Sequence, residues 1–207
     1  KSMDLIRSYL ADQFVFRVGG RAVASLVVEL CTSPKPGLVD RRNNGSHKDM
    51  NLRLFEASAQ ALRPYFEECV RLGLQGESVE ALQHLGMAAE EDMLRAAGVN
   101  THKGAIFTLG ILCGAAGRLL HFDPDALGAE CAAMTRGLSL AGHATSGGKL
   151  YAAHGITGAR GQAMSGFPAA VKIGLPALEK GAHLGLNRAG CGALLAILAQ
   201  IEDTNLI

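Results

Sequence analysis

Apolar residues recur at helical spacing along most of this chain, and the segments between them are polar and rich in glycine. Over residues 4–30 the period is that of an amphipathic helix, and it is carried by Leu5, Tyr9, Val23, Leu26 and Leu30. The run SPKPG at residues 33–37 ends this helix, because proline lacks a backbone donor and disfavours helical geometry in the residue before it. A long polar loop follows over residues 38–51.

The same periodicity predicts further helices over residues 51–73, 78–97, 104–121, 124–142, 168–180 and 187–201, with a kink or break at Pro64. Ser78 and Asp123 stand where N-cap residues are expected, and Pro124 stands at a first helical position. No segment alternates as a strand does. The sequence therefore predicts an all-α fold, in which residues 1–207 form a single helical bundle domain with long functional loops at one end. Because the chain stops just after the polar DTN motif at residues 203–205, we expect the natural protein to continue beyond it.

Composition and charge narrow the function classes. With 207 residues and 48% hydrophobic content, the chain can bury a sizeable core. A formal net charge of +1 provides no basic field, so we expect no nucleic-acid partner. The five cysteines are dispersed and form no C-x-x-C pair, which is typical of reduced thiols in a cytoplasmic protein. We also expect no membrane association, since the chain shows neither a signal peptide nor an apolar run of about 20 residues.

The stretch GVNTHKGAIF, residues 98–107, is a polar turn followed at once by an apolar helix. Free N–H groups in a first helical turn and the helix dipole attract anions, and His102 and Lys103 stand beside them. Asn100, Thr101 and Gly104 complete the candidate site, whose expected ligand is a phosphate chain. The alternative is an ordinary helix cap, with Asn100 or Thr101 as the N-cap residue. The motif is not a Walker A loop, because its lysine precedes the second glycine.

The loop SPKPGLVDRRNNGSHKDM, residues 33–50, carries charges of both signs. Asp40, His47 and Asp49 offer two carboxylates and an imidazole, and Lys35 and Arg41 are among its cations. This mixture suits a magnesium polyphosphate, because the metal prefers oxygen ligands and the phosphates bind lysine and arginine. The alternative is a solvated loop in which Asp49 caps the next helix.

Three other features could carry chemistry. Glu90 lies among small apolar neighbours on a predicted helix, so its carboxylate either points into a site or marks the edge of the core. The segment GARGQ, residues 158–162, is predicted as a tight cationic turn in which Arg160 could bind a phosphate, or as a surface turn. Asp203 in the DTN motif is a candidate metal ligand or part of a C-terminal cap.

Four ordered segments resemble the triphosphoribosyl-dephospho-coenzyme A synthase family, the ATP:dephospho-CoA triphosphoribosyl transferases. They are the loop at 33–50, AEEDMLRAAGVNTHKGAIFTLG at 89–110, GITGARGQA at 155–163 and DTN at 203–205. The resemblance implies an all-helical enzyme that joins the triphosphoribosyl group of ATP to the 2′-hydroxyl of 3′-dephospho-CoA and releases adenine. It also implies that the product is the prosthetic-group precursor of citrate lyase or malonate decarboxylase, passed on by a downstream acyl carrier protein transferase.

On this interpretation the reaction is a displacement at the anomeric carbon, with a transition state resembling an oxocarbenium ion. We assign triphosphate binding to His102, Lys103 and the amides around Gly104. The further candidate substrate-binding residues are Lys35, Arg41, Asn100, Thr101, Arg160 and Gln162. The candidate catalytic residues are Glu90, as the base, and Asp40 and His47. The candidate Mg²⁺ ligands are Asp40, Asp49 and Asp203, and the carboxylate roles could be exchanged.

Two differences from the family stand out. Gln162 is found where the resemblance implies glutamate, and the segment over residues 137–149 is short. Two other functions remain open: a magnesium-dependent hydrolase of nucleotides or ADP-ribose conjugates that uses the same residues, and a non-catalytic nucleotide-binding module. The chain could also form a homo-oligomer.

Overall fold

A computed structural model describes residues 2–139 and 157–200 of the chain. Its contacts divide the chain into two compact units. Unit 1 comprises Lys1–Cys31 and Lys35–Phe122, and unit 2 comprises Thr32–Pro34 and Asp123–Ile207. The described residues form helices and contain no strand, which confirms the predicted all-α class. The single-domain assignment stays a prediction.

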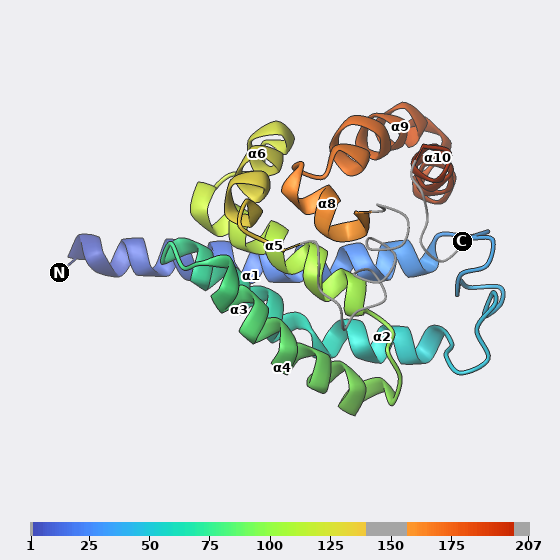
Figure 1. Ribbon diagram of the computed structural model, residues 1–207, viewed down its shortest axis with the longest axis horizontal. Helices are drawn as coiled ribbons and strands as arrows, with labels where there is room; N and C mark the ends of the chain where they lie inside the picture. Colours follow the sequence, from blue (N-terminus) through green and yellow to red (C-terminus); the bar gives the residue numbers. More distant parts are fainter. Residues whose placement is uncertain (1, 140–156, 201–207) are drawn as a thin grey trace. The chain divides into compact units, whose positions relative to one another are not determined.

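Unit 1 is built from helices that alternate with short connections, apart from the long loop after the first helix (Figure 1). The helices are α1 (Ser2–Cys31), α2 (Leu52–Ala61), α3 (Arg63–Leu74), α4 (Val79–Ala97) and α5 (Lys103–Leu119). Helix α3 packs against both α1 and α5, and α2 packs against α4. The largest fully buried apolar side chains of this bundle are Phe66, Leu62, Met93, Val15 and Val70.

Helices α3 and α5 approach each other backbone to backbone. A Cβ atom added to Gly73 would collide with the Gly114 carbonyl, and one added to Gly117 would collide with the Val70 carbonyl. Glycine is therefore required here by packing, because no other residue leaves room for two helix backbones at this separation. The close contact holds α5, whose first turn carries the predicted anion site, against α3.

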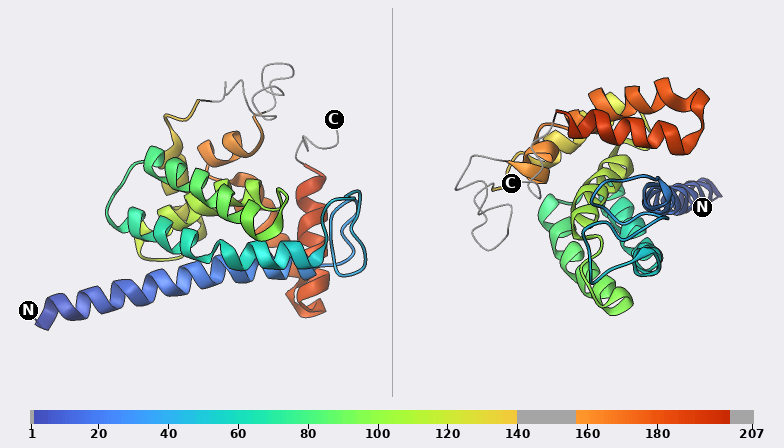
Figure 2. Two further views of the ribbon diagram at one scale, coloured as in Figure 1. Left: turned by 90° about the horizontal axis from the view of Figure 1, so that it is seen from below. Right: turned by 90° about the vertical axis from the view of Figure 1, so that its right-hand side faces the viewer.

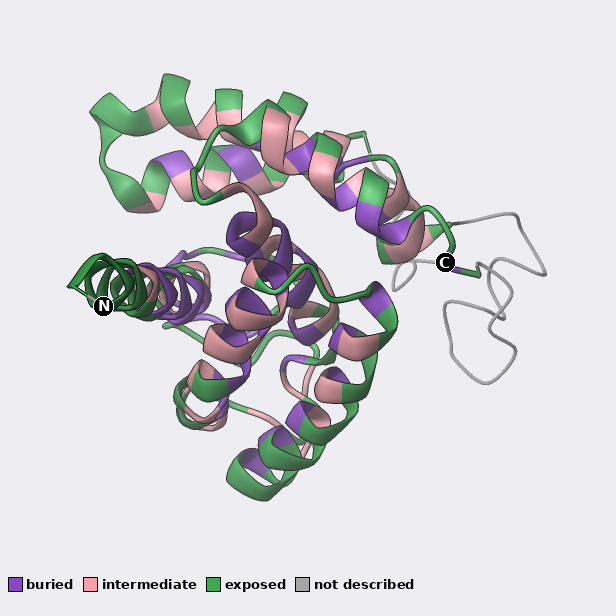
Figure 3. Cartoon of the chain, turned by 90° about the vertical axis from the view of Figure 1, so that its left-hand side faces the viewer, coloured by how far each residue is buried: buried purple, intermediate pink, exposed green. Residues whose placement is uncertain are grey.

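The first turns of α1 extend beyond the rest of unit 1 (Figure 2). Leu5 and Tyr9, which share the helical period, are 72% and 63% exposed, and the first buried residue of the helix is Phe14 (Figure 3). Periodicity shows which residues share a helix face, but burial of that face also needs a partner element of sufficient length.

Proline, glycine and side-chain caps mark several of the helix ends. The predicted helix over residues 51–73 breaks at Leu62 into α2 and α3, with Pro64 in the first turn of α3, where its missing N–H costs no intrahelical bond. Asn51 caps α2 by accepting bonds from two backbone N–H groups, so the alternative of Asp49 as the cap was wrong. Gly98 ends α4 in the left-handed conformation (φ 72°) that glycine adopts without strain.

Unit 2 contains shorter helical segments. They are α6 (Pro124–Thr135), α8 (Gly158–Met164), the π-helix η1 (Ala169–Gly174), α9 (Leu175–Gly181), the 3-10 turn η2 (Ala182–Leu184) and α10 (Leu186–Leu198). Helix α10 packs on α9 and η1, and α6 packs on α8. Asp123 caps α6 by accepting the Ala126 N–H at 2.8 Å, as predicted.

Two predictions for unit 2 were wrong. Helix α6 ends at Thr135 and does not reach residue 142. Residues 158–162 lie on α8 and are not a tight turn, because the bond from Gly161 N–H to the Thr157 carbonyl starts helical pairing there. The helix predicted over residues 168–180 is present, and it begins as a π-helix that becomes α-helical at Leu175.

No single helix among the described residues is long and apolar enough to cross a membrane. Helices α5 and α6 meet the criterion only when they are taken together across the break between them.

Candidate functional site

Asp40 organises the loop that follows α1. Its carboxylate accepts bonds from the backbone N–H groups of Lys35 (3.0 Å), Arg42 (2.7 Å) and Asn43 (3.1 Å), and the residue is only 3% exposed. Hydrogen bonds to a charged acceptor are stronger than neutral ones, so these three bonds hold the loop in one shape. Asp40 thereby fixes the backbone from which the Lys35 side chain departs.

Lys35 is buried and forms an ion pair with a residue of α1. Its Nζ lies 2.5 Å from Oε1 of Glu29, and the side chains of Lys35 and Glu29 are 3% and 43% exposed. A buried ammonium group is costly unless a carboxylate compensates it. The pair therefore allows a cation to lie inside unit 1 while its anion stays at the solvent edge.

His102 faces into unit 1. It is the N-cap residue of α5, is 6% exposed, and its Nδ1 lies 2.8 Å from the Ser58 hydroxyl on α2. The Thr101 hydroxyl donates to the same Ser58 oxygen at 2.7 Å. The backbone N–H of His102 contacts the Met93 sulfur at 3.1 Å, and the Phe55 ring meets the imidazole edge-on at 4.9 Å between centroids. Neither Asn100 nor Thr101 is the N-cap residue that the helix-cap alternative required.

Burial lowers the pKa of His102 to about 4, and the positive charge of Lys35 acts in the same direction. The imidazole is therefore neutral at neutral pH. It contributes hydrogen bonds to the site and no positive charge.

Lys103, the next residue, faces solvent. Its Nζ lies 2.6 Å from Oε2 of Glu90 on α4, and the two side chains are 53% and 32% exposed. The Lys103 N–H donates to Oδ1 of Asn100 at 3.2 Å. A half-exposed ion pair contributes little to stability, so a stronger anion can displace Glu90 from Lys103.

The backbone beside Gly104 is open. A Cβ atom added there would meet nothing within 4 Å. In the part of the chain that the structure describes, the N–H groups of Gly104 and Ala105 have no hydrogen-bond acceptor. Packing does not require glycine at residue 104, and two backbone donors in the first turn of α5 remain for an anion.

Tyr65 links α3 to α5 below this turn. Its hydroxyl donates to the Ile106 carbonyl at 2.8 Å, and the absence of a side chain at Gly110 leaves room for it. Burial is the main cause that raises the pKa of Tyr65, and nearby Glu90 adds a smaller effect. The phenol therefore stays protonated and serves as a structural donor.

The predicted residues of unit 2 bind the backbone of their own unit. Arg160 donates from Nη1 to the Ser139 carbonyl at 2.9 Å. Oε1 of Gln162 accepts the N–H of Ala169, the first residue of η1, at 3.2 Å. A glutamate would offer an oxygen to the same N–H, so the amide at residue 162 keeps this acceptor.

The predicted magnesium ligands do not form a cluster among the described residues, where no three His, Cys, Asp or Glu side chains could together hold a metal ion. Both carboxylate oxygens of Asp40 accept backbone hydrogen bonds, and Asp49 is exposed. His47 is half-buried in the loop, and Arg41 is exposed. Asp203 lies outside the described residues.

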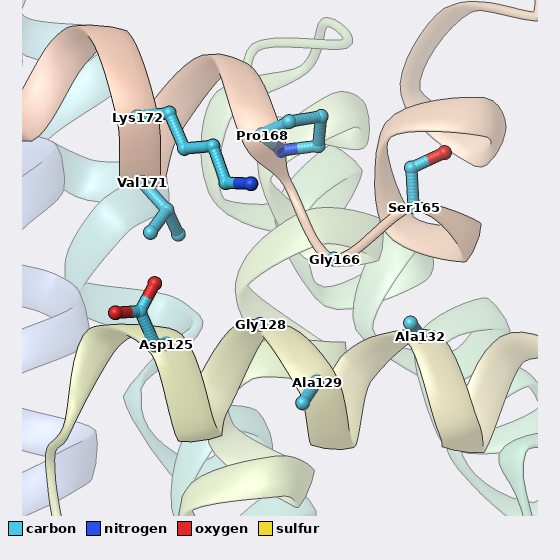
Figure 4. Close-up of a pocket in the computed structure, with 9 residues that line it drawn as sticks. All are labelled: Asp125, Gly128, Ala129, Ala132, Ser165, Gly166, Pro168, Val171 and Lys172. Carbon is cyan, nitrogen blue, oxygen red and sulfur yellow. The ribbon is translucent and has the colours of Figure 1, made fainter.

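Unit 2 has a pocket between α6 and the segment that joins α8 to η1 (Figure 4). Asp125 of α6 and Lys172 of η1 lie on facing walls, and Ser165 lies near its other end. Gly128 and Gly166 bring the two walls together, because a Cβ atom on either would collide with the carbonyl of the other. None of these residues belongs to the predicted set.

Sequence reasoning missed Glu29 and Ser58. Ser58 is 44 positions from His102 and lies between two alanines, and Glu29 lies on a long helix with other exposed charges. No local pattern marks either residue. Only the packing of α1 and α2 against the loop and the start of α5 reveals them.

Comparisons with known proteins agree on one family. The family model CitG: ATP:dephospho-CoA triphosphoribosyl transferase matches residues 16–207. A 2-(5''-triphosphoribosyl)-3'-dephosphocoenzyme-A synthase of Pectobacterium atrosepticum is 39% identical, over 100% of this chain and 75% of its own length. A probable synthase of the same name in Albidiferax ferrireducens is 41% identical, over 92% of this chain and 69% of its own length. Protein CitXG of Haemophilus influenzae is 37% identical, over 99% of this chain and 49% of its own length. No solved structure matches.

Proposed function

Because this chain belongs to the ATP:dephospho-CoA triphosphoribosyl transferase family, we propose that it transfers the triphosphoribosyl group of ATP to the 2′-hydroxyl of 3′-dephospho-CoA. The bond between C1 of the ribose and the adenine nitrogen breaks, and a bond between C1 and the acceptor oxygen forms. The acceptor hydroxyl gives its proton to a base, and adenine leaves with one proton gained. The family match over residues 16–207 carries this proposal, since it includes every residue of the cluster around the start of α5.

The triphosphate is assigned to the start of α5. Two lysines support this assignment of the triphosphate: the half-exposed Lys103 and the buried Lys35. The open backbone at Gly104 adds amide donors that point along the helix dipole. The protein has little phosphoryl chemistry to perform here, because the reacting atom is the sugar carbon. Firm binding of the phosphates serves to present C1 to the acceptor.

Glu90 is assigned as the base, or as the carboxylate that stabilises positive charge near C1. Its ion pair with Lys103 would link the release of Glu90 to the binding of ATP. Triphosphate oxygens compete with Glu90 for Lys103, so ATP would release this carboxylate for the acceptor hydroxyl. His47 and Asp40 remain candidates in the loop, and Arg41, Arg160 and Gln162 remain candidates for other parts of the two substrates.

Mg²⁺ is proposed to enter as part of magnesium ATP. In proteins Mg²⁺ keeps several waters and is often bound by substrate phosphates with only one or two carboxylates. That mode fits a chain whose described carboxylates form no cluster. Asp40, Asp49 and Asp203 are the candidates for such a single ligand.

Mass spectrometry of the products tests the reaction. The chain is incubated with ATP, MgCl₂ and 3′-dephospho-CoA, and we expect free adenine together with an acceptor heavier by one triphosphoribosyl group. A 2′-deoxy acceptor is the matched control, and it should give no adduct because it lacks the attacking oxygen. Release of ADP or AMP without an adduct would identify a hydrolase, and ATP binding without turnover would identify a binding module.

The product is proposed to be the prosthetic-group precursor of citrate lyase or malonate decarboxylase acyl carrier protein. A downstream transferase would load it, and the cytoplasm is the proposed compartment. We also propose that copies of this chain associate as a homo-oligomer.

A further inference from the structure

The hydrogen bonds of the Ser58 hydroxyl determine which ring nitrogen of His102 carries the hydrogen. The Thr101 hydroxyl donates to the Ser58 oxygen, and Ser58 is fully buried at 0% exposure. Ser58 has one proton to give. Among the described residues, the only other partner of its hydroxyl is Nδ1 of His102, at 2.8 Å. If Nδ1 carried the hydrogen, the Ser58 proton would be buried without an acceptor, which is costly.

We infer that Ser58 is a positioning residue that holds His102 as a neutral imidazole with its hydrogen on Nε2, so that His102 offers the substrate an uncharged donor beside Lys35. The inference rests on the proposed function for the identity of that substrate. The donor is assigned to an oxygen of the triphosphoribosyl group, because His102 immediately precedes Lys103 at the start of α5. Ser58 itself does not touch the substrate.

The position of Nε2 agrees with this role. Nε2 has no hydrogen-bond partner among the described residues. It is not, however, one of the side-chain nitrogens and oxygens in that part of the chain that are both buried and without a hydrogen-bond partner. Nε2 is therefore within reach of solvent, and of a ligand, although the residue as a whole is 6% exposed. The other ring nitrogen is occupied by the bond to Ser58.

The charges around the ring favour a neutral donor. The loop contributes the ammonium of Lys35, which is compensated by Glu29 of α1. Helix α5 contributes Lys103, which is paired with Glu90 of α4. Helix α2 contributes the Ser58 hydroxyl and the apolar Phe55 ring to the contacts of the imidazole. A second positive charge beside Lys35 would be repelled, whereas a neutral N–H adds a hydrogen bond at no electrostatic cost.

Nitrogen NMR of the histidine rings tests the inference directly. The chain has seven histidines, and the signal of His102 is assigned by its loss in His102→Gln. We expect the form with hydrogen on Nε2 at neutral pH, and no ring protonation down to about pH 5. Hydrogen on Nδ1, or a charged ring at neutral pH, would overturn the inference. This measurement needs no turnover, so its outcome is independent of the transferase proposal.

Paired substitutions supply the functional readout. The side-chain NH₂ of glutamine can take the place of Nε2–H, whereas that of asparagine lies nearer Nδ1. We expect His102→Gln to keep a kcat/KM for ATP at least about 10-fold above that of His102→Asn. Equal losses in the two variants would contradict a donor role for Nε2.

Ser58→Ala tests the positioning role. We expect it to mix the two neutral forms of His102 in the NMR spectrum and to raise KM for ATP more than it lowers kcat. Ser25→Ala is the matched control, because the Ser25 hydroxyl bonds only a carbonyl of its own helix, that of Arg21. A His102 spectrum in Ser58→Ala identical to that of the unmodified chain would refute the role of Ser58, and Thr101→Val provides a second test if Ser58→Ala does not fold.

Discussion

The two units use their polar side chains differently. In unit 1 the buried Lys35 and His102 bond other side chains, Glu29 at the solvent edge and Ser58 inside the bundle. In the described part of unit 2 they bind backbone: Arg160 bonds Ser139, Gln162 bonds Ala169, and Asn187 both accepts from and donates to Ser33. The bonds in unit 1 hold polar side chains near the start of α5, where they can meet a ligand. The bonds in unit 2 stabilise short helices.

The difference shows where chemistry is expected. Short helical segments such as those of unit 2 leave many backbone groups without intrahelical partners, and side chains satisfy them. The long helices of unit 1 satisfy their own backbone, so the buried polar side chains that bond one another there, such as His102 and Ser58, serve another purpose. Substitutions in the two units should therefore differ in kind: loss of activity in unit 1 and loss of stability in unit 2.

Glu90→Gln should have the largest effect. If Glu90 accepts the proton or stabilises charge near C1, turnover should fall by about 10²–10⁴-fold while ATP binding survives. Steady-state kinetics and calorimetric ATP binding measure the two quantities. Glu91→Gln is the matched control, since this neighbour on α4 is exposed. Near-normal turnover in Glu90→Gln would remove Glu90 from the chemistry.

The neutral His102 should make the stability of the fold depend on pH. Its folded-state pKa of about 4 lies below the unfolded value of 6.5, so between these values the unfolded chain binds a proton that the folded chain does not. The contribution of the neutral imidazole to the free energy of unfolding is complete above the unfolded-state pKa, and it is lost as the pH falls towards the folded-state pKa. We expect about 2 kcal/mol to be lost between about pH 7 and pH 5.

Urea unfolding at the two pH values measures this loss. His102→Gln should remove this part of the pH dependence, whereas His84→Gln, at an exposed position, should keep it. Identical pH dependence in His102→Gln and the unmodified chain would show that His102 is not the responsible group.

Gly104→Ala should separate function from stability. An alanine meets nothing at this position, and it should stabilise α5 by up to about 1 kcal/mol while it obstructs the triphosphate and raises KM for ATP. Gly98→Ala is the comparison, because the φ of 72° there should make alanine destabilising by about 1 kcal/mol. Thermal unfolding and KM measure both. An unchanged KM in Gly104→Ala would argue against binding of the phosphates at this backbone.

Gln162→Glu should have the smallest effect. The carboxylate retains the acceptor for the Ala169 N–H, so we expect stability within about 0.5 kcal/mol of the original. Gln162→Leu removes the acceptor and should cost about 1 kcal/mol, because the N–H loses its partner. A large change in kcat in Gln162→Glu, with stability unchanged, would instead give residue 162 a place in the chemistry.

The sequence by itself determined the helical class, most helix starts and the motif at residues 98–107. These features depend on periodicity, caps and proline, which act over a few neighbouring residues. The nearness of Glu90 and Lys103 likewise depends on neighbouring segments, because α4 runs directly into the turn that begins α5.

Only the tertiary structure decided which polar groups lie inside. Consecutive residues of a helix start point in different directions, and packing alone made His102 buried and neutral and left Lys103 exposed. The same holds for Ser58 and Glu29, whose partners lie on other elements. The form of an imidazole and the burial of an ammonium depend on contacts between distant segments, and no local pattern in the sequence encodes them.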